Sequence, residues 1–84
     1  MSQEPWQVVV TSPVTKALRR LDRVQRERLQ RAIARLPAGD TKRLVGLDEW
    51  RLRVGDWRVR YAVDAPARRI VVLAVDPRGS AYKP

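Results

Sequence analysis

Two short segments in the second half of the chain alternate between large apolar or aromatic side chains and, for the most part, arginine. They span residues 50–54 and 57–63, and the dipeptide Gly55-Asp56 separates them. A period of two places successive side chains on opposite faces of a β-strand. A two-residue Gly-Asp connection is typical of a tight β-hairpin. The sequence therefore predicts an antiparallel hairpin with one apolar face and one arginine-rich face.

The first half of the chain follows a helical period instead. Apolar residues recur at three- and four-residue spacing within residues 14–21 and again within 29–36, which is the pattern of amphipathic helices. Asp22, with Gln25 three residues later, resembles a capping box that opens the second helix. The Pro-Ala-Gly-Asp sequence at 37–40 ends it. We expect two helices that form a helical hairpin.

Two further apolar segments complete the prediction. Residues 7–11 form a β-branched run before the helices, and residues 70–75 are apolar on both faces, which indicates a central strand. The expected element order is β-α-α-β-β-β, an α+β fold in a single domain spanning residues 1–84. Both helices should pack on the sheet face that carries Leu52, Val59 and Tyr61.

The charge balance narrows the classes of partner. Eighteen Lys and Arg residues face nine Asp and Glu residues, a formal net charge of +9. Such an excess favours a polyanionic partner, and solubility alone is the alternative. The chain has no cysteine and no histidine, which excludes disulfides, the usual zinc sites, thiol nucleophiles and histidine acid–base chemistry. With no signal sequence and no apolar run long enough for a bilayer, a cytoplasmic protein is expected.

The predicted hairpin gathers four arginines on one face, which we call the arginine face. With a two-residue turn, the opposed pairs are Arg53 with Arg58 and Arg51 with Arg60. Like charges directly opposed across strands destabilise a sheet by about 0.2–1 kcal/mol per pair. A phosphate backbone would relieve this repulsion, because guanidinium groups offer it bidentate donors. Neighbouring acids such as Asp76 or Glu49 could also neutralise the cluster. We favour a platform for single-stranded RNA, with Trp50 and Trp57 on the core side.

Taken together, these motifs resemble the RelE/ParE superfamily of toxins. Residues 42–47 match the Lys/Arg-Leu-x-Gly segment that precedes the hairpin in that family, and residues 50–54 match its strand with two basic residues two apart. Residues 55–61 resemble its Gly-Asp-Tyr-Arg-Val-x-Tyr signature. Arg78 and Tyr82, four apart, match the C-terminal pair of RelE-like ribonucleases. The likeness covers essentially the whole chain.

The resemblance implies a RelE-like fold, in which a mainly antiparallel sheet of about four strands carries a helical hairpin on one face. It also implies a ribosome-dependent, metal-independent and cofactor-free endoribonuclease that cleaves mRNA by 2′-hydroxyl attack on the scissile phosphate. Phosphate binding and transition-state stabilisation would fall to Arg51, Arg53 and Arg58. Arg78 would assist the leaving 5′-oxygen, and Tyr82 would orient or stack the nucleotide.

Further RNA contacts and the partners follow from the same resemblance. The additional RNA-binding residues would be Arg60, Lys42, Arg43 and Lys83. The partners would be the ribosome with its mRNA and a RelB-like antitoxin that forms a hetero-oligomer with the toxin, without any membrane. Many relatives have a histidine where this chain has Pro77, so the general base stays open between Asp76, Tyr82 and a ribosomal group. The alternatives are a ParE-like, non-hydrolytic inhibitor of DNA gyrase and a basic binding module without catalysis.

Overall fold

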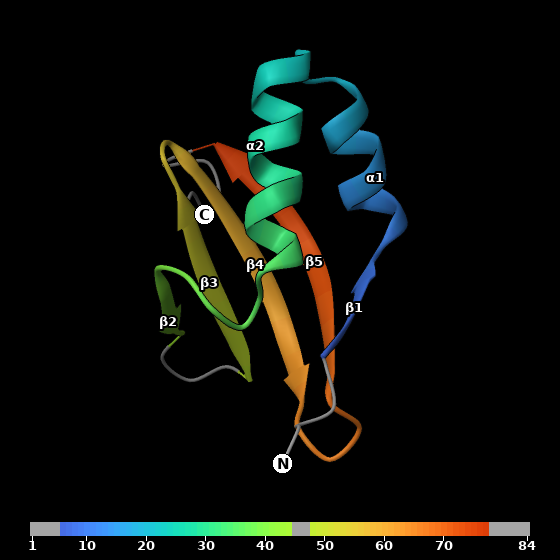
Figure 1. The fold of residues 1–84 in the computed structure, drawn as a ribbon, viewed down its shortest axis with the longest axis vertical. Helices are drawn as coiled ribbons and strands as arrows, with labels where there is room; N and C mark the ends of the chain where they lie inside the picture. The colour runs from blue at the N-terminus through green and yellow to red at the C-terminus, as the bar shows by residue number, and fades with distance from the viewer. Residues whose placement is uncertain (1–5, 45–47, 78–84) are drawn as a thin grey trace.

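The computed structural model describes residues 6–44 and 48–77 and contains two helices and five strands (Figure 1). In chain order the elements are β1 Gln7–Val10, α1 Ser12–Arg19, α2 Arg23–Ala34, β2 Thr41–Arg43, β3 Glu49–Val54, β4 Trp57–Asp64 and β5 Arg69–Pro77. The α+β class is confirmed, and the predicted elements occur in the predicted order, with one additional strand, β2. None of the described helices is long and apolar enough to cross a bilayer.

The strands form one mixed sheet in the order β1-β5-β4-β3-β2. β1 runs parallel to β5, and the other neighbours are antiparallel. β5 lies between β1 and β4, so the doubly apolar strand is internal to the sheet, and β4 is the central one. The sheet has five strands rather than about four because of β2, whose three residues were predicted only as part of a connecting segment. Two of its three side chains are exposed and charged, so no alternation marks it as a strand.

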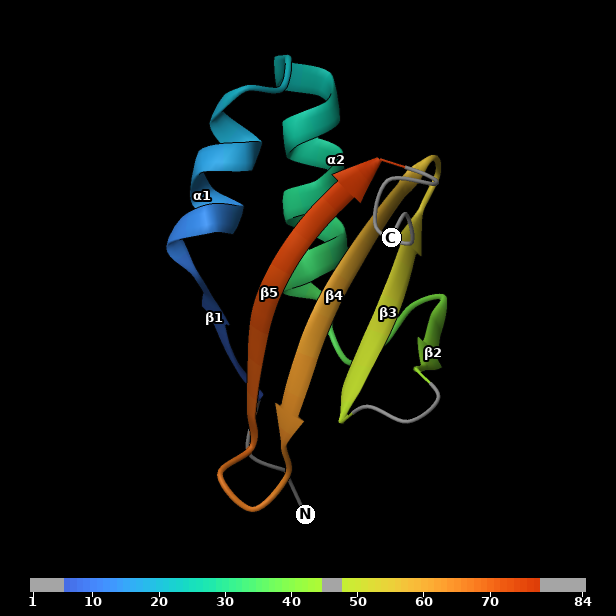
Figure 2. The same cartoon turned by 180° about the vertical axis from the view of Figure 1, so that it is seen from behind.

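Both helices cover the same face of the sheet and leave the other face bare, as Figures 1 and 2 show from opposite sides. α1 packs over β5 and α2 over β3. The core residues on the covered face are buried, with 2% of Leu52, none of Val59 and 1% of Tyr61 exposed. From the helices, the core receives Val14 and Leu18 of α1 and Leu29 and Ile33 of α2. The predicted orientation of the hairpin is therefore correct.

The β3–β4 hairpin has the register that the sequence predicts. Val54 pairs with Trp57, so the turn consists of Gly55 and Asp56 alone. Gly55 has φ +58°, in the left-handed region that favours glycine and that this type of hairpin turn requires. Trp50 and Trp57 pack against the core, as their place in the alternation indicates.

Two hydrogen bonds hold α2 in place. The backbone N–H of Gln25 donates to Oδ1 of Asp22 at 2.8 Å, so Asp22 caps the helix as predicted. The indole Nε1 of Trp57 donates to Oε1 of the same Gln25 at 2.9 Å, which ties the first turn of α2 to the start of β4. The hairpin is thus fixed relative to the helix above it.

Candidate nucleic-acid interface

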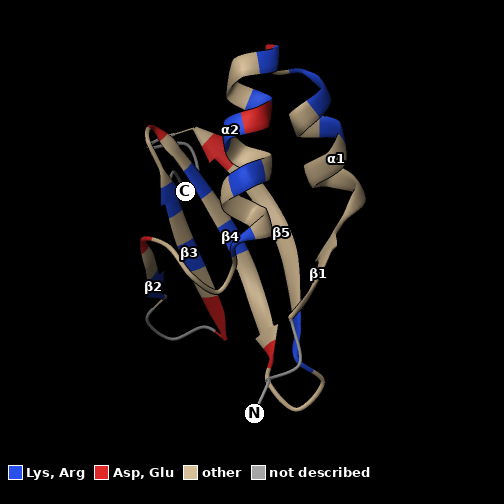
Figure 3. Cartoon of the chain, viewed as in Figure 1, with Lys and Arg blue, Asp and Glu red and all other residues tan. Residues whose placement is uncertain are grey.

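The sequence predicts four arginines on the bare face of the sheet, which Figure 2 shows in front, and Figure 3 marks the Lys and Arg positions along β3 and β4. In the β3–β4 ladder, Arg51 is opposite Arg60 and Arg53 is opposite Arg58. Directly opposed residues of an antiparallel pair point to the same face. All four guanidinium groups therefore lie on the side of the sheet that the helices do not cover.

β2 adds one more cation to this face. Lys42 pairs with Arg51, which in turn pairs with Arg60, so a row of three cations crosses β2, β3 and β4. Arg43 pairs with Trp50 and therefore points to the opposite face, where it lies 3.6 Å from Asp48 in an exposed ion pair. Of the two predicted RNA contacts on β2, only Lys42 joins the arginine face.

Two carboxylates form ion pairs with the arginine face, and the sequence indicated only one of these two. Nη1 of Arg60 lies 3.2 Å from Oε1 of Glu49, so Glu49 does neutralise part of the cluster. Nε of Arg53 lies 2.7 Å from Oδ2 of Asp40, a residue that was not predicted here. Asp40 was missed because only the pairing of β2 with β3 brings it beside Arg53, and β2 itself was not predicted.

Arg58 has a different environment from its neighbours. Asp76 of β5 is its partner in the adjoining ladder, yet no ion pair joins the two side chains in the described part of the chain. Nη1 of Arg58 instead donates to the carbonyl oxygens of Gly55 at 3.1 Å and Trp57 at 3.0 Å. These backbone acceptors orient the guanidinium toward the hairpin turn without cancelling its charge.

A buried donor on Arg60 has no acceptor. Its Nε is shielded from solvent and has no hydrogen-bond partner among the described residues. A buried donor without an acceptor costs about 1–3 kcal/mol. Arg60 thus keeps one buried polar atom unsatisfied, although its Nη1 is paired with Glu49.

Tyr61 lies on the core side of β4, and its surroundings shift the pKa of its phenol. Burial raises the pKa of its phenol above the ordinary 10.0, because desolvation disfavours the phenolate, and a side-chain hydrogen bond with Thr41 opposes this shift. Tyr61 thus links β4 to β2 beneath β3. Its hydroxyl lies in the core, away from the arginine face.

Three predicted residues, Arg78, Tyr82 and Lys83, lie outside the described residues, as do positions 45–47 of the Lys/Arg-Leu-x-Gly segment. The described chain ends at Pro77, which pairs with Trp57 beside the hairpin turn. The roles expected for these three side chains stay predictions.

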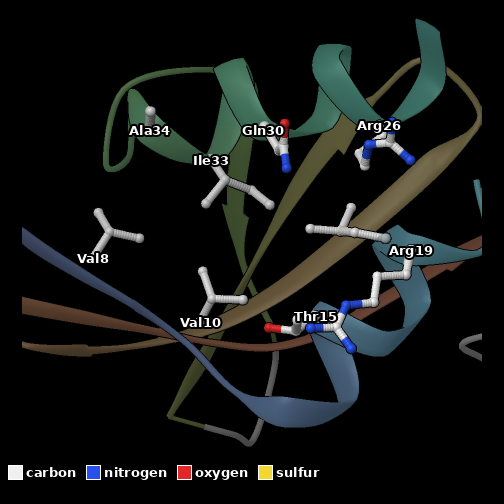
Figure 4. A pocket seen from close by; sticks show the side chains of 9 residues that line it. Val8, Val10, Thr15, Arg19, Arg26, Gln30, Ile33 and Ala34 are labelled. Atoms are coloured by element: carbon white, nitrogen blue, oxygen red, sulfur yellow. The ribbon is translucent and has the colours of Figure 1, made fainter. Parts of the chain in front are cut away.

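A groove lies on the helix-bearing side of the molecule, bounded by β1, α1 and α2 (Figure 4). It has a volume of about 480 Å³, and Val8, Val10, Leu18 and Ile33 form its apolar part. Arg19 and Arg26 supply its cationic part. Val10, on the edge strand β1, keeps 38% of its surface exposed. Large exposed apolar side chains beside a groove are typical of a protein interaction site.

Comparison with known proteins assigns the chain to the RelE/ParE toxins that the sequence motifs resemble. A family model described as the ParE toxin of the type II toxin–antitoxin system parDE matches residues 8–82. Because this match spans most of the chain, the chain belongs to that family of type II toxin–antitoxin toxins. No curated protein matches it.

Solved structures agree with this assignment. The chain is similar to the archaeal RelE–RelB complex of Pyrococcus horikoshii OT3, with 29% identity and a TM-score of 0.76 over 92% of this chain and 99% of that one. The RelBE2 toxin–antitoxin complex of Mycobacterium tuberculosis gives 23% identity and a TM-score of 0.75, over 89% and 100%. The isolated RelE toxin of E. coli gives 20% and 0.68, over 92% and 90%. The latter two similarities concern the fold alone.

Proposed function

We propose that this toxin is an endoribonuclease that inhibits translation by cleaving mRNA on the ribosome. The proposal depends on the cations of the bare sheet face. Lys42, Arg51 and Arg60 form a row across three strands, and Arg53 is opposite Arg58. Guanidinium groups on a rigid sheet bind phosphates at fixed spacing, and an open cationic face suits an extended single strand.

The expected chemistry is a transesterification within the RNA. The 2′-hydroxyl attacks the adjacent phosphorus, and the bond to the 5′-oxygen breaks. The products are a 2′,3′-cyclic phosphate and a 5′-hydroxyl end. Negative charge builds up on the phosphorane, and preorganised donors from Arg51, Arg53 and Arg58 would stabilise it. Arg78 would assist the departing 5′-oxygen, and Tyr82 would orient the nucleotide.

The proton of the 2′-hydroxyl needs an acceptor, and Asp76 is the candidate that the described geometry supports. Its partner in the ladder is Arg58, so its carboxylate is on the arginine face. Unlike Asp40 and Glu49, it is not held by an ion pair within the described residues. A carboxylate without an ion pair can approach a hydroxyl without first releasing an arginine.

A cleavage assay tests this function. Ribosomes carrying a defined mRNA would be incubated with the purified toxin, and the new ends would be mapped. We expect a cut within the translated region, a 2′,3′-cyclic phosphate at the upstream end, and at least about a 100-fold loss of rate in Arg53→Ala, as for removal of one transition-state donor. An intact mRNA would contradict the proposal.

We also propose a RelB-like antitoxin as the partner of this chain. The P. horikoshii and M. tuberculosis relatives were solved as complexes with RelB-type antitoxins. The groove between β1, α1 and α2 has an apolar surface, and Arg19 and Arg26 also line it. An amphipathic antitoxin segment with acidic residues beside its apolar side chains would complement both properties. A further acidic stretch of the antitoxin would mask the arginine face.

Inhibition of DNA gyrase without catalysis is the second candidate, and the name of the matching family model favours it. Expression of the toxin in bacteria separates the two functions. Rapid arrest of protein synthesis with cleaved mRNA supports the ribonuclease. Induction of the DNA-damage response while mRNA stays intact supports the gyrase inhibitor.

A further inference from the structure

One arginine of α2 lies at the turn of the β3–β4 hairpin. α2 runs alongside this hairpin (Figure 1), and Arg28 of α2 reaches across to Gly55. A Cβ atom built on Gly55 would lie 2.9 Å from both Nη atoms of Arg28. The guanidinium of Arg28 therefore packs directly on the turn glycine, from the side of the helix.

A second guanidinium contacts the same glycine. Nη1 of Arg58 donates to the carbonyl oxygen of Gly55 at 3.1 Å, and it reaches this atom from β4. Arg28 is exposed and Arg58 is partly buried. Within the described residues neither forms an ion pair. Two cations thus converge on one residue with no carboxylate bound to either.

The acids nearest in sequence or in the sheet do not cancel these charges. Asp56 follows Gly55 in the turn and is exposed, and Asp76 is opposite Arg58 in the ladder. Neither takes part in an ion pair of the described chain. Converging like charges destabilise a fold, and a bound anion that accepts from both would relieve the repulsion.

The donor geometry suits such an anion. The described hydrogen bonds of Arg58 use Nη1 alone, which leaves the N–H groups of Nη2 and Nε available. The carbonyl acceptors hold the Arg58 group still, and the packing on Gly55 holds Arg28. A phosphate oxygen accepts well from two such groups.

We infer that Arg28 and Arg58 clamp one phosphodiester group of the RNA at the hairpin turn. This inference rests on the proposed ribonuclease function and extends its site. The RNA strand would leave the arginine face over the hairpin turn and pass toward α2. Arg28 is then an RNA-binding residue, whereas the exposed Arg23 and Arg31 of the same helix are surface cations outside the site.

The salt dependence of RNA binding tests the clamp. The probe is a 2′-O-methyl oligoribonucleotide of about ten residues, a length within the range that single-strand binding surfaces cover; its blocked 2′-oxygens prevent cleavage. Binding of the purified chain would be measured by fluorescence anisotropy at several salt concentrations. Each phosphate contact on a single strand contributes about 0.7 to the slope of log affinity against log salt. We expect Arg28→Gln and Arg58→Gln each to lower the slope by about this amount.

Arg31→Gln is the matched control, because Arg31 is an exposed arginine one turn further along α2. It makes the same change of charge, and we expect it to leave the slope nearly unaltered. Arg28→Lys should keep most of the slope, since it keeps the charge. The glutamine side chain of Arg28→Gln still covers Gly55. If Arg28 had a purely structural role, the slope of log affinity against log salt would therefore not change in this variant.

The outcomes separate this inference from the proposed function. If Arg28→Gln behaves like Arg31→Gln while Arg58→Gln lowers the slope, the clamp is wrong. The proposed RNA-binding role of the arginine face is then retained. If all three variants lower the slope equally, net charge explains the binding and both ideas fail. A wild-type chain that does not bind the probe contradicts both as well.

Discussion

Asp40 and Arg53 are joined twice in this structure. The carboxylate Oδ2 of Asp40 lies 2.7 Å from Nε of Arg53, and the backbone N–H of Arg53 donates to the carbonyl oxygen of Asp40 at 2.9 Å. The backbone bond places the start of β2 beside β3. The ion pair then lowers the net positive charge of the arginine face at Arg53, one of the residues proposed to bind phosphate.

Removing this carboxylate should strengthen RNA binding. In Asp40→Asn, Arg53 no longer has a competing anion, so we expect a severalfold gain in affinity for a single-stranded oligoribonucleotide at low salt. The free energy of unfolding should change by less than about 1 kcal/mol, because the pair is exposed. Anisotropy titrations and thermal unfolding measure the two effects.

Glu27→Gln is the control for that experiment, because Glu27 also pairs with an arginine, Arg23, but on α2. It raises the net charge by the same amount. We expect little gain in affinity from it. Equal gains in both variants would show that total charge, rather than the position of Asp40, controls binding.

Alanine variants of the arginine face and of the predicted site residue Arg78 should abolish toxicity without unfolding the protein. Arg53→Ala, Arg58→Ala and Arg78→Ala should each lower the rate of mRNA cleavage at least about 100-fold. Arg23→Ala, on the exposed start of α2, should retain most of the activity. Cleavage assays and circular dichroism on the same preparations check both statements. Similar losses at Arg23 and Arg53 would show that the assigned site is wrong.

The core makes a separate prediction about stability. Leu29 is fully buried, whereas Val24, on the same helix, keeps 76% of its surface exposed. Leu29→Ala should lower the free energy of unfolding by about 2–5 kcal/mol, because it leaves a cavity beneath α2. Val24→Ala should change it by no more than about 0.5 kcal/mol. Urea unfolding of the two variants gives both values.

The raised pKa of Tyr61 predicts that the folded chain loses stability in alkali. Its pKa is raised in the folded chain by burial, so the neutral phenol is favoured by folding. Its contribution is fully present below the unfolded pKa of about 10 and is lost as the pH rises through the folded value. The free energy of unfolding should therefore fall above pH 10, and it should fall less steeply in Tyr61→Phe. Parallel slopes in the two proteins would contradict this assignment.

The sequence predicted the hairpin fully because its determinants are local. The alternation of residues 50–54 and 57–63 sets the faces, and Gly55 sets the turn, so the opposed arginine pairs follow from counting. The cap at Asp22 is equally local. β2 could not be predicted in this way, because three residues with two exposed cations acquire their strand geometry only by pairing with β3.

The parts of the site that the sequence missed depend on contacts between distant residues. Asp40 reaches Arg53 through β2, and Arg28 reaches Gly55 through the packing of α2 on the hairpin. Arg26 is a third such residue: it is partly buried, donates to the carbonyl oxygen of Leu21 at 3.2 Å and lines the groove, because the helical hairpin folds back over β1.

The groove gives the last prediction, which separates antitoxin binding from catalysis. In Val10→Asp a carboxylate replaces an apolar side chain in the groove, so an apolar antitoxin segment would have to desolvate a charge on docking. We expect the affinity for the antitoxin to fall at least about tenfold, since an unpaired charge in an interface costs several kcal/mol. Calorimetry with the purified antitoxin measures this loss.

The cleavage rate of Val10→Asp should stay at the wild-type level, because the groove and the arginine face lie on opposite sides of the sheet. Val24→Asp is the matched control: it makes the same substitution at an exposed valine outside the groove, and it should leave the antitoxin affinity unaltered. A cell expressing both proteins would then be poisoned by the Val10→Asp toxin but not by the Val24→Asp toxin. If the antitoxin still neutralises Val10→Asp, its apolar contact lies elsewhere, and the arginine face becomes the main docking surface.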